Sequence, residues 1–114
     1  MTISCFLNKL NNSPKSIDFT DTMKVIEANY IFTQTAFKNG EINNELGTNS
    51  GSCKLFAFAK LNELCVEKTL YCFGGYYRKD VLENPEGTDH ANIRNFIKYG
   101  WDGIEFENQA LETI

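Results

Sequence analysis

The stretch from Asn49 to Leu61 reads NSGSCKLFAFAKL, and it decides the fold. Asn49 and Ser50 can cap a helix here, because such side chains accept hydrogen bonds from the first amides of a helix. From Leu55 to Leu61 almost no polar face remains, which is typical of a helix buried on most of its sides. We therefore expect a central helix around which the rest of the chain packs.

Two helices are predicted before the central one. Apolar residues recur at helical spacing from Ile3 to Leu10, and Thr2 stands in the position of an N-cap. A second helix is expected to start with Thr20 as its N-cap and to stop near Asn29. Both segments are amphipathic, so each should pack one face on the core.

Two helices are also predicted after the central one. The first begins near Val66 and continues to the turn at Asn84, with Gly74-Gly75 in its interior. Two interior glycines cost roughly 2 kcal/mol relative to alanine. We therefore expect either a break there or another backbone packed closely against the glycines.

The last predicted helix starts at Thr88 or Asp89 and buries an apolar face that includes Ile97. Gly100 fits the left-handed position that ends many helices. Trp101 then falls where a Schellman ending packs a side chain back on the last turn, which gives the single Trp a structural role.

Strands are predicted on either side of a tight turn. β-branched and aromatic residues run from Ile31 to Phe37, and Asn39-Gly40 can supply the two positive φ angles of a type I′ turn before residues 41–43. A lone hairpin is marginal in water, so a third strand is expected, and residues 103–107 are the candidate. The predicted fold is α+β and predominantly α, with about five helices around the buried central helix and a small antiparallel β-hairpin or three-stranded sheet.

Composition fits one domain that spans residues 1–114. Hydrophobic residues make up 42% of the chain and include nine Phe, five Tyr and one Trp, enough for a core without disulfides or metal. The net charge of −4 arises in the tail, and no window concentrates Lys or Arg as nucleic-acid binding requires. No run approaches a membrane span and no signal peptide is recognised, so the chain is expected to be cytoplasmic.

Cysteine and histidine usage argues against a metal site or a cofactor. The four cysteines match neither a CxxC pair nor paired zinc ligands, and mostly buried, reduced thiols are the interpretation we favour. One histidine excludes a multi-histidine site within the chain. The opening of the central helix, residues 51–54, superficially resembles a phosphate cradle, but it lacks the Gly-Lys-Ser/Thr order of a Walker motif.

Candidate catalytic residues lie in the run from Gly87 to Phe96, GTDHANIRNF. Asp89 is either a general base or the cap of the last helix, and the cap is favoured. His90 is either an acid/base group or a structural neutral ring that donates one hydrogen bond, and the structural role is favoured. Arg94 lies one turn after His90 and can hold a carboxylate or phosphate, with a salt bridge to a local aspartate as the alternative.

Candidate binding residues share cationic, aromatic or amide chemistry near helix starts or near the Gly-Gly break. Tyr77 and Arg78 adjoin that break, where they can line a cleft, although core packing with a snorkelling arginine explains them nearly as well. The full set is Lys54, Tyr77, Arg78, Asn92 and Arg94.

The chain resembles the HopJ type III effector family over nearly its whole length. The resemblance rests on several ordered segments: Tyr30-x-Phe32, Phe37-x-Asn39-Gly40, Gly51-Ser52-x-Lys54 with Phe56-Ala57-Phe58-Ala59, Cys72-Phe73-Gly74 with Tyr77-Arg78, and the run from Gly87 to Phe96 followed by Gly100-Trp101. The family takes its name from a plant-pathogen protein that is injected into host cells, and members also occur in bacteria that are not such pathogens. It brings no established catalytic residues, and the chain departs from its common pattern at Gln34, Cys65 and Gly75.

Two functional hypotheses follow, and a purely structural role of the run is a third. The first is a non-catalytic binding or effector-type module that recognises a protein partner or an anionic small molecule through Lys54, Arg78, His90 and Arg94. The second is a housekeeping enzyme that uses His90 as acid/base, with Asp89 orienting it and an anionic small molecule as substrate. The resemblance adds export by a type III system as an alternative to a cytoplasmic location, and the oligomeric state is left open.

Overall fold

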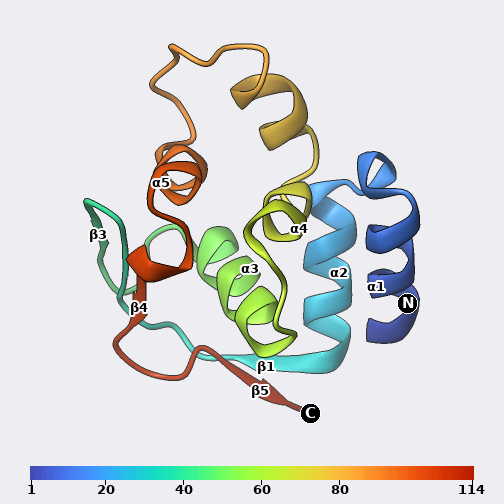
Figure 1. Cartoon of the computed structure of the whole chain (residues 1–114). Helices are drawn as coiled ribbons and strands as arrows, with labels where there is room; N and C mark the ends of the chain where they lie inside the picture. Colours follow the sequence, from blue (N-terminus) through green and yellow to red (C-terminus); the bar gives the residue numbers. More distant parts are fainter.

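The computed structural model describes residues 1–114 and places α3 (Ser50–Leu61) at the centre of the fold (Figure 1). This helix buries Cys53 and every residue from Leu55 to Ala59, so the predicted central helix is confirmed. The Phe56 ring alone meets four others, those of Phe37, Phe73, Phe96 and Trp101, at centroid distances of 6.2, 5.5, 4.9 and 6.5 Å. Rings packed this closely hold distant parts of the chain on one helix.

Four further α-helices, three short helices of other types and five short strands surround α3 (Figure 1). None of the helices is long and apolar enough to cross a membrane. The α-helices are α1 (Ile3–Asn12), α2 (Phe19–Asn29), α4 (Val66–Tyr71) and α5 (Ala91–Tyr99); the 3₁₀ helices are η1 (Pro14–Ser16) and η3 (Gly100–Gly103); the π-helix is η2 (Tyr76–Val81). The strands are β1 (Tyr30–Phe32), β2 (Phe37–Asn39), β3 (Ile42–Asn44), β4 (Ile104–Phe106) and β5 (Leu111–Thr113).

The first two helices follow the prediction except at one cap. Helix α1 begins after Thr2, whose side chain accepts a hydrogen bond from a first-turn amide, as expected. Helix α2 ends at Asn29 as predicted, but its N-cap is Asp18 and not Thr20. The backbone N–H of Asp18 donates to the Asp21 carboxylate at 3.0 Å, and this reciprocal arrangement places the helix start two residues earlier.

The hairpin between β2 and β3 forms with a different turn. Asn39 pairs with Ile42, so the loop consists of Gly40 and Glu41, and only Gly40 has a positive φ, of 60°. The predicted type I′ turn with Asn39 at a positive φ is therefore wrong. Asn39 stays in the strand because its fully buried side chain is hydrogen-bonded to Asn92.

The strands form two small antiparallel sheets rather than one. Strand β4 pairs with β2, which confirms residues 103–107 as the source of a third strand, in the order β3-β2-β4. Strand β1 turns away from this sheet and pairs with β5, with Tyr30 opposite Thr113 and Phe32 opposite Leu111. Residues 31–37 are therefore not one strand, and β5 was not predicted.

Both outcomes expected at Gly74-Gly75 occur: the helix breaks there, and another backbone packs closely against the first glycine. Helix α4 ends at Tyr71, and the chain resumes as the π-helix η2 after Gly74, which has a φ of 62°. A Cβ at Gly74 would lie 2.6 Å from the backbone nitrogen of Phe19. The start of α2 thus packs directly against this glycine, where no side chain fits.

Helix α5 ends at Tyr99, next to Gly100 as predicted, but the Gly100 ψ of −156° lies outside the left-handed helical region that was expected. The helix also buries a narrower face than predicted. Gly100 has a φ of 63°, and the Trp101 ring packs edge-on against Phe96 with centroids 5.1 Å apart. The Trp101 indole also donates to the carbonyl of Leu64 at 2.9 Å. Ile97 is 46% exposed, so its predicted burial is wrong, because the core side of α5 is occupied by its neighbour Phe96.

Candidate functional site

The only histidine of the chain lines a hollow between the starts of α3 and α5. The hollow measures about 440 Å³, within the range of small-molecule sites. No Asp, Glu, Lys or Arg lines it, so His90 and Tyr76 are its titratable groups. We call it the His90 hollow, and its walls are Phe19, Ile42, Asn49, Gly51, Ser52, Phe73, Tyr76, His90, Ala91, Asn92 and Ile93.

Both helices that open onto the His90 hollow begin without a side-chain cap. Their N-cap residues, Asn49 and His90, each have a left-handed φ of 50°, and neither side chain accepts from the first turn. The amides of residues 50–52 in α3 and of Ala91 and Asn92 in α5 donate no hydrogen bond within the chain. Free amides at a helix start carry partial positive charge and favour an anionic acceptor.

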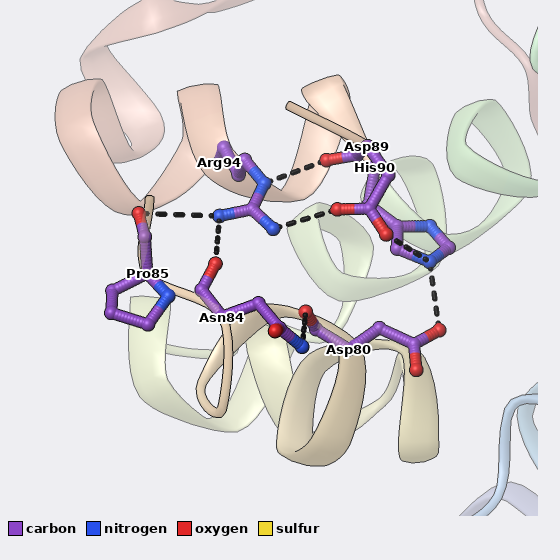
Figure 2. A network of polar contacts seen from close by, with 6 residues as sticks. All are labelled: Asp80, Asn84, Pro85, Asp89, His90 and Arg94. Carbon is purple, nitrogen blue, oxygen red and sulfur yellow. Dashed lines mark hydrogen bonds and ion pairs between the residues drawn. The ribbon is translucent and has the colours of Figure 1, made fainter. Parts of the chain in front are cut away.

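His90 is held by a carboxylate and an aromatic ring. Its Nε2–H donates to Oδ2 of Asp80 at 2.9 Å, and Oδ2 of Asp89 lies at 3.8 Å (Figure 2). The imidazole ring lies against Tyr76, with centroids 5.1 Å apart. Since Nδ1 makes no hydrogen bond within the chain and is not a buried orphan, a neutral ring presents it as an acceptor.

Arg94 fastens the loop that carries His90 to helix α5 (Figure 2). Its Nε donates to the Asp89 carbonyl at 2.7 Å and its Nη2 to the Asp89 carboxylate at 2.7 Å. Its Nη1 donates to the carbonyls of Asn84 and Pro85 at 2.9 and 3.4 Å. These contacts use four of the five N–H groups of a guanidinium, so Arg94 positions the loop and has little left for a ligand.

Asp89 is an ion-pair residue and not the cap of α5. The N-cap of the helix is His90, so α5 begins one residue later than an Asp89 cap would require. The Asp89 carboxylate turns to Arg94 instead, and that hydrogen bond, together with the nearby His90, holds its pKa below the ordinary value. The predicted cap is wrong, because a charged partner within reach competes with the helix amides.

Four asparagines, three of them buried, form a hydrogen-bond network at the wall of the His90 hollow. Asn39 donates to the backbone carbonyl of Asn92 at 2.7 Å and to its side-chain oxygen at 3.0 Å. Asn92 and Asn44 exchange two amide hydrogen bonds of 3.0 and 3.1 Å, and Asn49 donates to Asn44 at 2.7 Å. The network joins β2, β3 and the starts of α3 and α5, so it fixes the two uncapped helix starts relative to each other.

Lys54 lies outside the His90 hollow. Its ammonium nitrogen lies 3.9 Å from the Glu27 carboxylate and 5.0 Å from the centre of the Phe32 ring. These contacts tie α3 to α2 and to β1. Gly51 and Ser52 line the hollow, whereas Lys54, only two residues further along α3, lies on another face of the helix.

Tyr77 and Arg78 also lie away from the His90 hollow. The Tyr77 ring packs edge-on against Tyr71 with centroids 5.6 Å apart, and burial raises its pKa. Arg78 lies 3.4 Å from the Asp18 carboxylate. Of the predicted site residues, only His90 and Asn92 line the His90 hollow.

Three residues of the site were not predicted: Asp80, which holds His90, and Phe19 and Ile42, which line the hollow. Asp80 lies ten positions before His90, on a different helix, and no local pattern relates the two. The aromatic residues after the Gly-Gly break did indicate a cleft, and Tyr76 is the one that lines the hollow. The structure shows no cluster of three or more His, Cys, Asp or Glu side chains that could hold a metal ion.

The fold and site define a small α+β domain with a ligand-sized hollow at two helix starts. The chain belongs to the HopJ type III effector protein family, whose model matches residues 3–111. It is also similar to a crystal structure of VPA0580, a protein of unknown function, with a TM-score of 0.98 and 54% identity over 100% of this chain and 95% of that one. No curated protein is significantly similar to the chain.

Proposed function

We propose that the protein is a binding module whose His90 hollow takes a small molecule with an anionic group beside an apolar part. The observation that carries this proposal is the meeting of two uncapped helix starts at one hollow. Five first-turn amides without acceptors point to a carboxylate or a similar anion as the missing partner.

The walls of the His90 hollow support the apolar part of the proposed ligand. Phe19, Phe73 and Tyr76 provide aromatic surface, and Ile42 and Ile93 provide aliphatic surface. Sites for small molecules combine apolar walls with a few polar groups that fix orientation. An aromatic carboxylate such as benzoate meets both requirements and serves as the probe.

The test replaces Ala91, the first residue of α5, with glutamate. A carboxylate in the first turn stabilises a helix by about 0.3–1 kcal/mol through the dipole, and α5 has no acidic residue there. The same carboxylate occupies the hollow wall and repels an anion. Ala91→Glu should therefore raise the Tm of the free protein and abolish the further rise that benzoate produces in wild type.

Ala91→Gln is the matched control, because it adds the same bulk without charge. It should keep part of the benzoate effect, and benzyl alcohol should stabilise none of the three proteins. Equal benzoate stabilisation of wild type and Ala91→Glu would contradict the proposal.

A catalytic function is the second candidate, and the His90–Asp80 pair favours it. A carboxylate that fixes one imidazole nitrogen leaves the other as a base, and here the partner is Asp80 at 2.9 Å rather than Asp89. This candidate predicts turnover of p-nitrophenyl acetate that His90→Gln removes. Hydrolysis by wild type no faster than by His90→Gln would count against it.

The proposal includes the cellular location of the protein. Unpaired thiols fit a reducing compartment, so we place the binding module in the cytoplasm of the producing cell. Export as an effector is the alternative that the family description suggests. A tagged protein that appears in the medium of a type III-competent strain, and not of a secretion-deficient strain, would favour the effector role.

A further inference from the structure

Arg78 uses fewer of its hydrogen-bond donors than Arg94 does. Arg94 makes four hydrogen bonds, whereas Arg78 makes one, to Oδ1 of Asp18 at 3.4 Å. The Arg78 side chain is only 19% exposed, and its Nε is buried without any partner. A mostly buried guanidinium with unused donors is uncommon, because such groups are ordinarily satisfied.

The surroundings of Arg78 are basic. A hollow of about 560 Å³ lies beside it, with walls formed by Lys15, Tyr71, Arg78, Lys79, Leu82 and Glu83. Three cations face one carboxylate there, in a chain whose net charge is −4. Like charges gathered in one hollow raise the local concentration of anions. We call this site the basic hollow.

The backbone under the basic hollow is unusual. Arg78 and Lys79 lie on the π-helix η2, the gold ribbon above α4 in Figure 1. π-Helical turns occur frequently at functional sites, because they shift side chains from the positions that an α-helix would give them. Here the shift follows the Gly74 break and places two adjacent cations at the same hollow as Lys15 from η1.

The rim of the basic hollow is apolar. Leu82 is 50% exposed, and the Tyr71 ring forms part of the wall. A guanidinium fork and two ammonium groups suit the oxygens of a phosphate group, and the rim suits a carbon group attached to it.

We propose that the basic hollow is a second binding site, separate from the His90 hollow, and that it takes a phosphate monoester with an apolar substituent. The phosphate engages Arg78, Lys15 and Lys79, and the substituent lies against Tyr71 and Leu82. Binding gives acceptors to the Nη groups of Arg78, which make one hydrogen bond within the chain.

Phenyl phosphate is the probe, and NMR of the arginine Nε–H groups is the readout. The Arg78 Nε–H signal should move to saturation while that of Arg94 stays in place. The double variant Lys15→Gln/Lys79→Gln changes two exposed side chains and should fold normally. It should weaken phenyl phosphate binding roughly tenfold, which corresponds to about 1.4 kcal/mol.

Two control variants distinguish binding at the basic hollow from binding elsewhere on the surface. Lys38→Gln removes an exposed lysine on β2 and should leave the affinity unchanged, and so should Ala91→Glu in the His90 hollow. An Arg78 signal that does not move, or an affinity that the lysine pair does not change, would overturn the proposal. So would a loss of phenyl phosphate binding in Ala91→Glu.

A further arm identifies the source of the phosphate group. The protein is sedimented with phosphatidylcholine vesicles with and without phosphatidic acid. Sedimentation that requires phosphatidic acid, and that falls in the lysine pair, supports a lipid headgroup as the monoester. Binding of phenyl phosphate with no sedimentation supports a free phosphate ester.

Discussion

At the residue scale, the polar side chains around His90 are arranged by their charges rather than by the needs of a helix end. Asp89 turns away from the amides of α5 and binds Arg94, and Asp80 holds His90. This leaves the first amides of α5 without an acceptor. The vacant helix start is therefore a direct consequence of the ion pairs beside it.

The Asp89–Arg94 contact predicts a pH dependence of stability. The pKa of Asp89 is lowered in the folded protein, so its contribution to stability is present above the ordinary aspartate pKa of about 3.9 and is lost as pH falls through the folded value. Urea unfolding of Asp89→Asn should show lower stability than wild type at pH 7 and a shallower decline below pH ~5. Asp102→Asn, at an exposed residue without an ion pair, should behave like wild type; identical profiles for Asp89→Asn and wild type would exclude the contact.

The cysteines predict selective thiol chemistry. Burial raises the pKa of the Cys53 thiol to about 11 and that of the Cys72 thiol to about 12, whereas Cys5 and Cys65 are exposed. Because the thiolate is the reactive form, Cys5 and Cys65 should be alkylated in the native protein at pH 8, and all four after denaturation. Mass spectrometry after iodoacetamide treatment counts the modified sites. Rapid modification of Cys72 in the native protein would contradict the packing around it.

At the element scale, the Gly-Gly break joins α2 to the segment that carries the basic hollow and Tyr76. Gly74 takes a positive φ and lies against the backbone at the start of α2, so it cannot accept a side chain. Gly75 has a helical φ of −61°, and a Cβ there would meet no atom within 4 Å. Only the first of the two glycines is required by the fold.

These neighbours make a matched pair of substitutions. Gly74→Ala should lower the free energy of unfolding by about 2–4 kcal/mol, because it combines backbone strain with overpacking. Gly75→Ala should be neutral or stabilising by up to about 1 kcal/mol. Chemical denaturation of both variants measures the difference, and equal effects would show that the close approach to α2 does not exist.

The elements themselves were predicted wherever their signal is local. The apolar run of α3, the glycine after α5 and the alternation before Glu107 each indicate structure within a few residues. The prediction missed Asp18 as the cap of α2, because Thr20 is a competing cap candidate two residues away. It missed strand β5, because that strand forms only by pairing with β1, which is distant in sequence. The asparagine network shows the same limit: Asn39 and Asn92 are far apart in sequence, and only the fold brings them into contact.

At the scale of the whole molecule, the buried helix α3 connects the core to the candidate site. Its middle packs the aromatic rings, and Gly51 and Ser52 in its first turn line the His90 hollow. The sequence identified His90 and Asn92, which line that hollow, because rare or polar residues stand out at a helix start. The alternative given for Arg94, a salt bridge to a local aspartate, is the one that forms, with Asp89. The sequence did not predict that Lys54 and Arg78 would pair with Glu27 and Asp18, since these ion pairs depend on tertiary placement.

The proposed function requires the two helix starts to share one anionic ligand, and an amide NMR titration with benzoate examines that requirement at the atoms concerned. We expect the amides of Gly51, Ser52, Ala91 and Asn92 to shift together to one saturating affinity, while the amides of Lys15 and Lys79 do not shift. Benzyl alcohol at the same concentrations should shift none of them. Benzoate shifts that miss these four amides, or that benzyl alcohol reproduces, would show that the helix starts do not form an anion site.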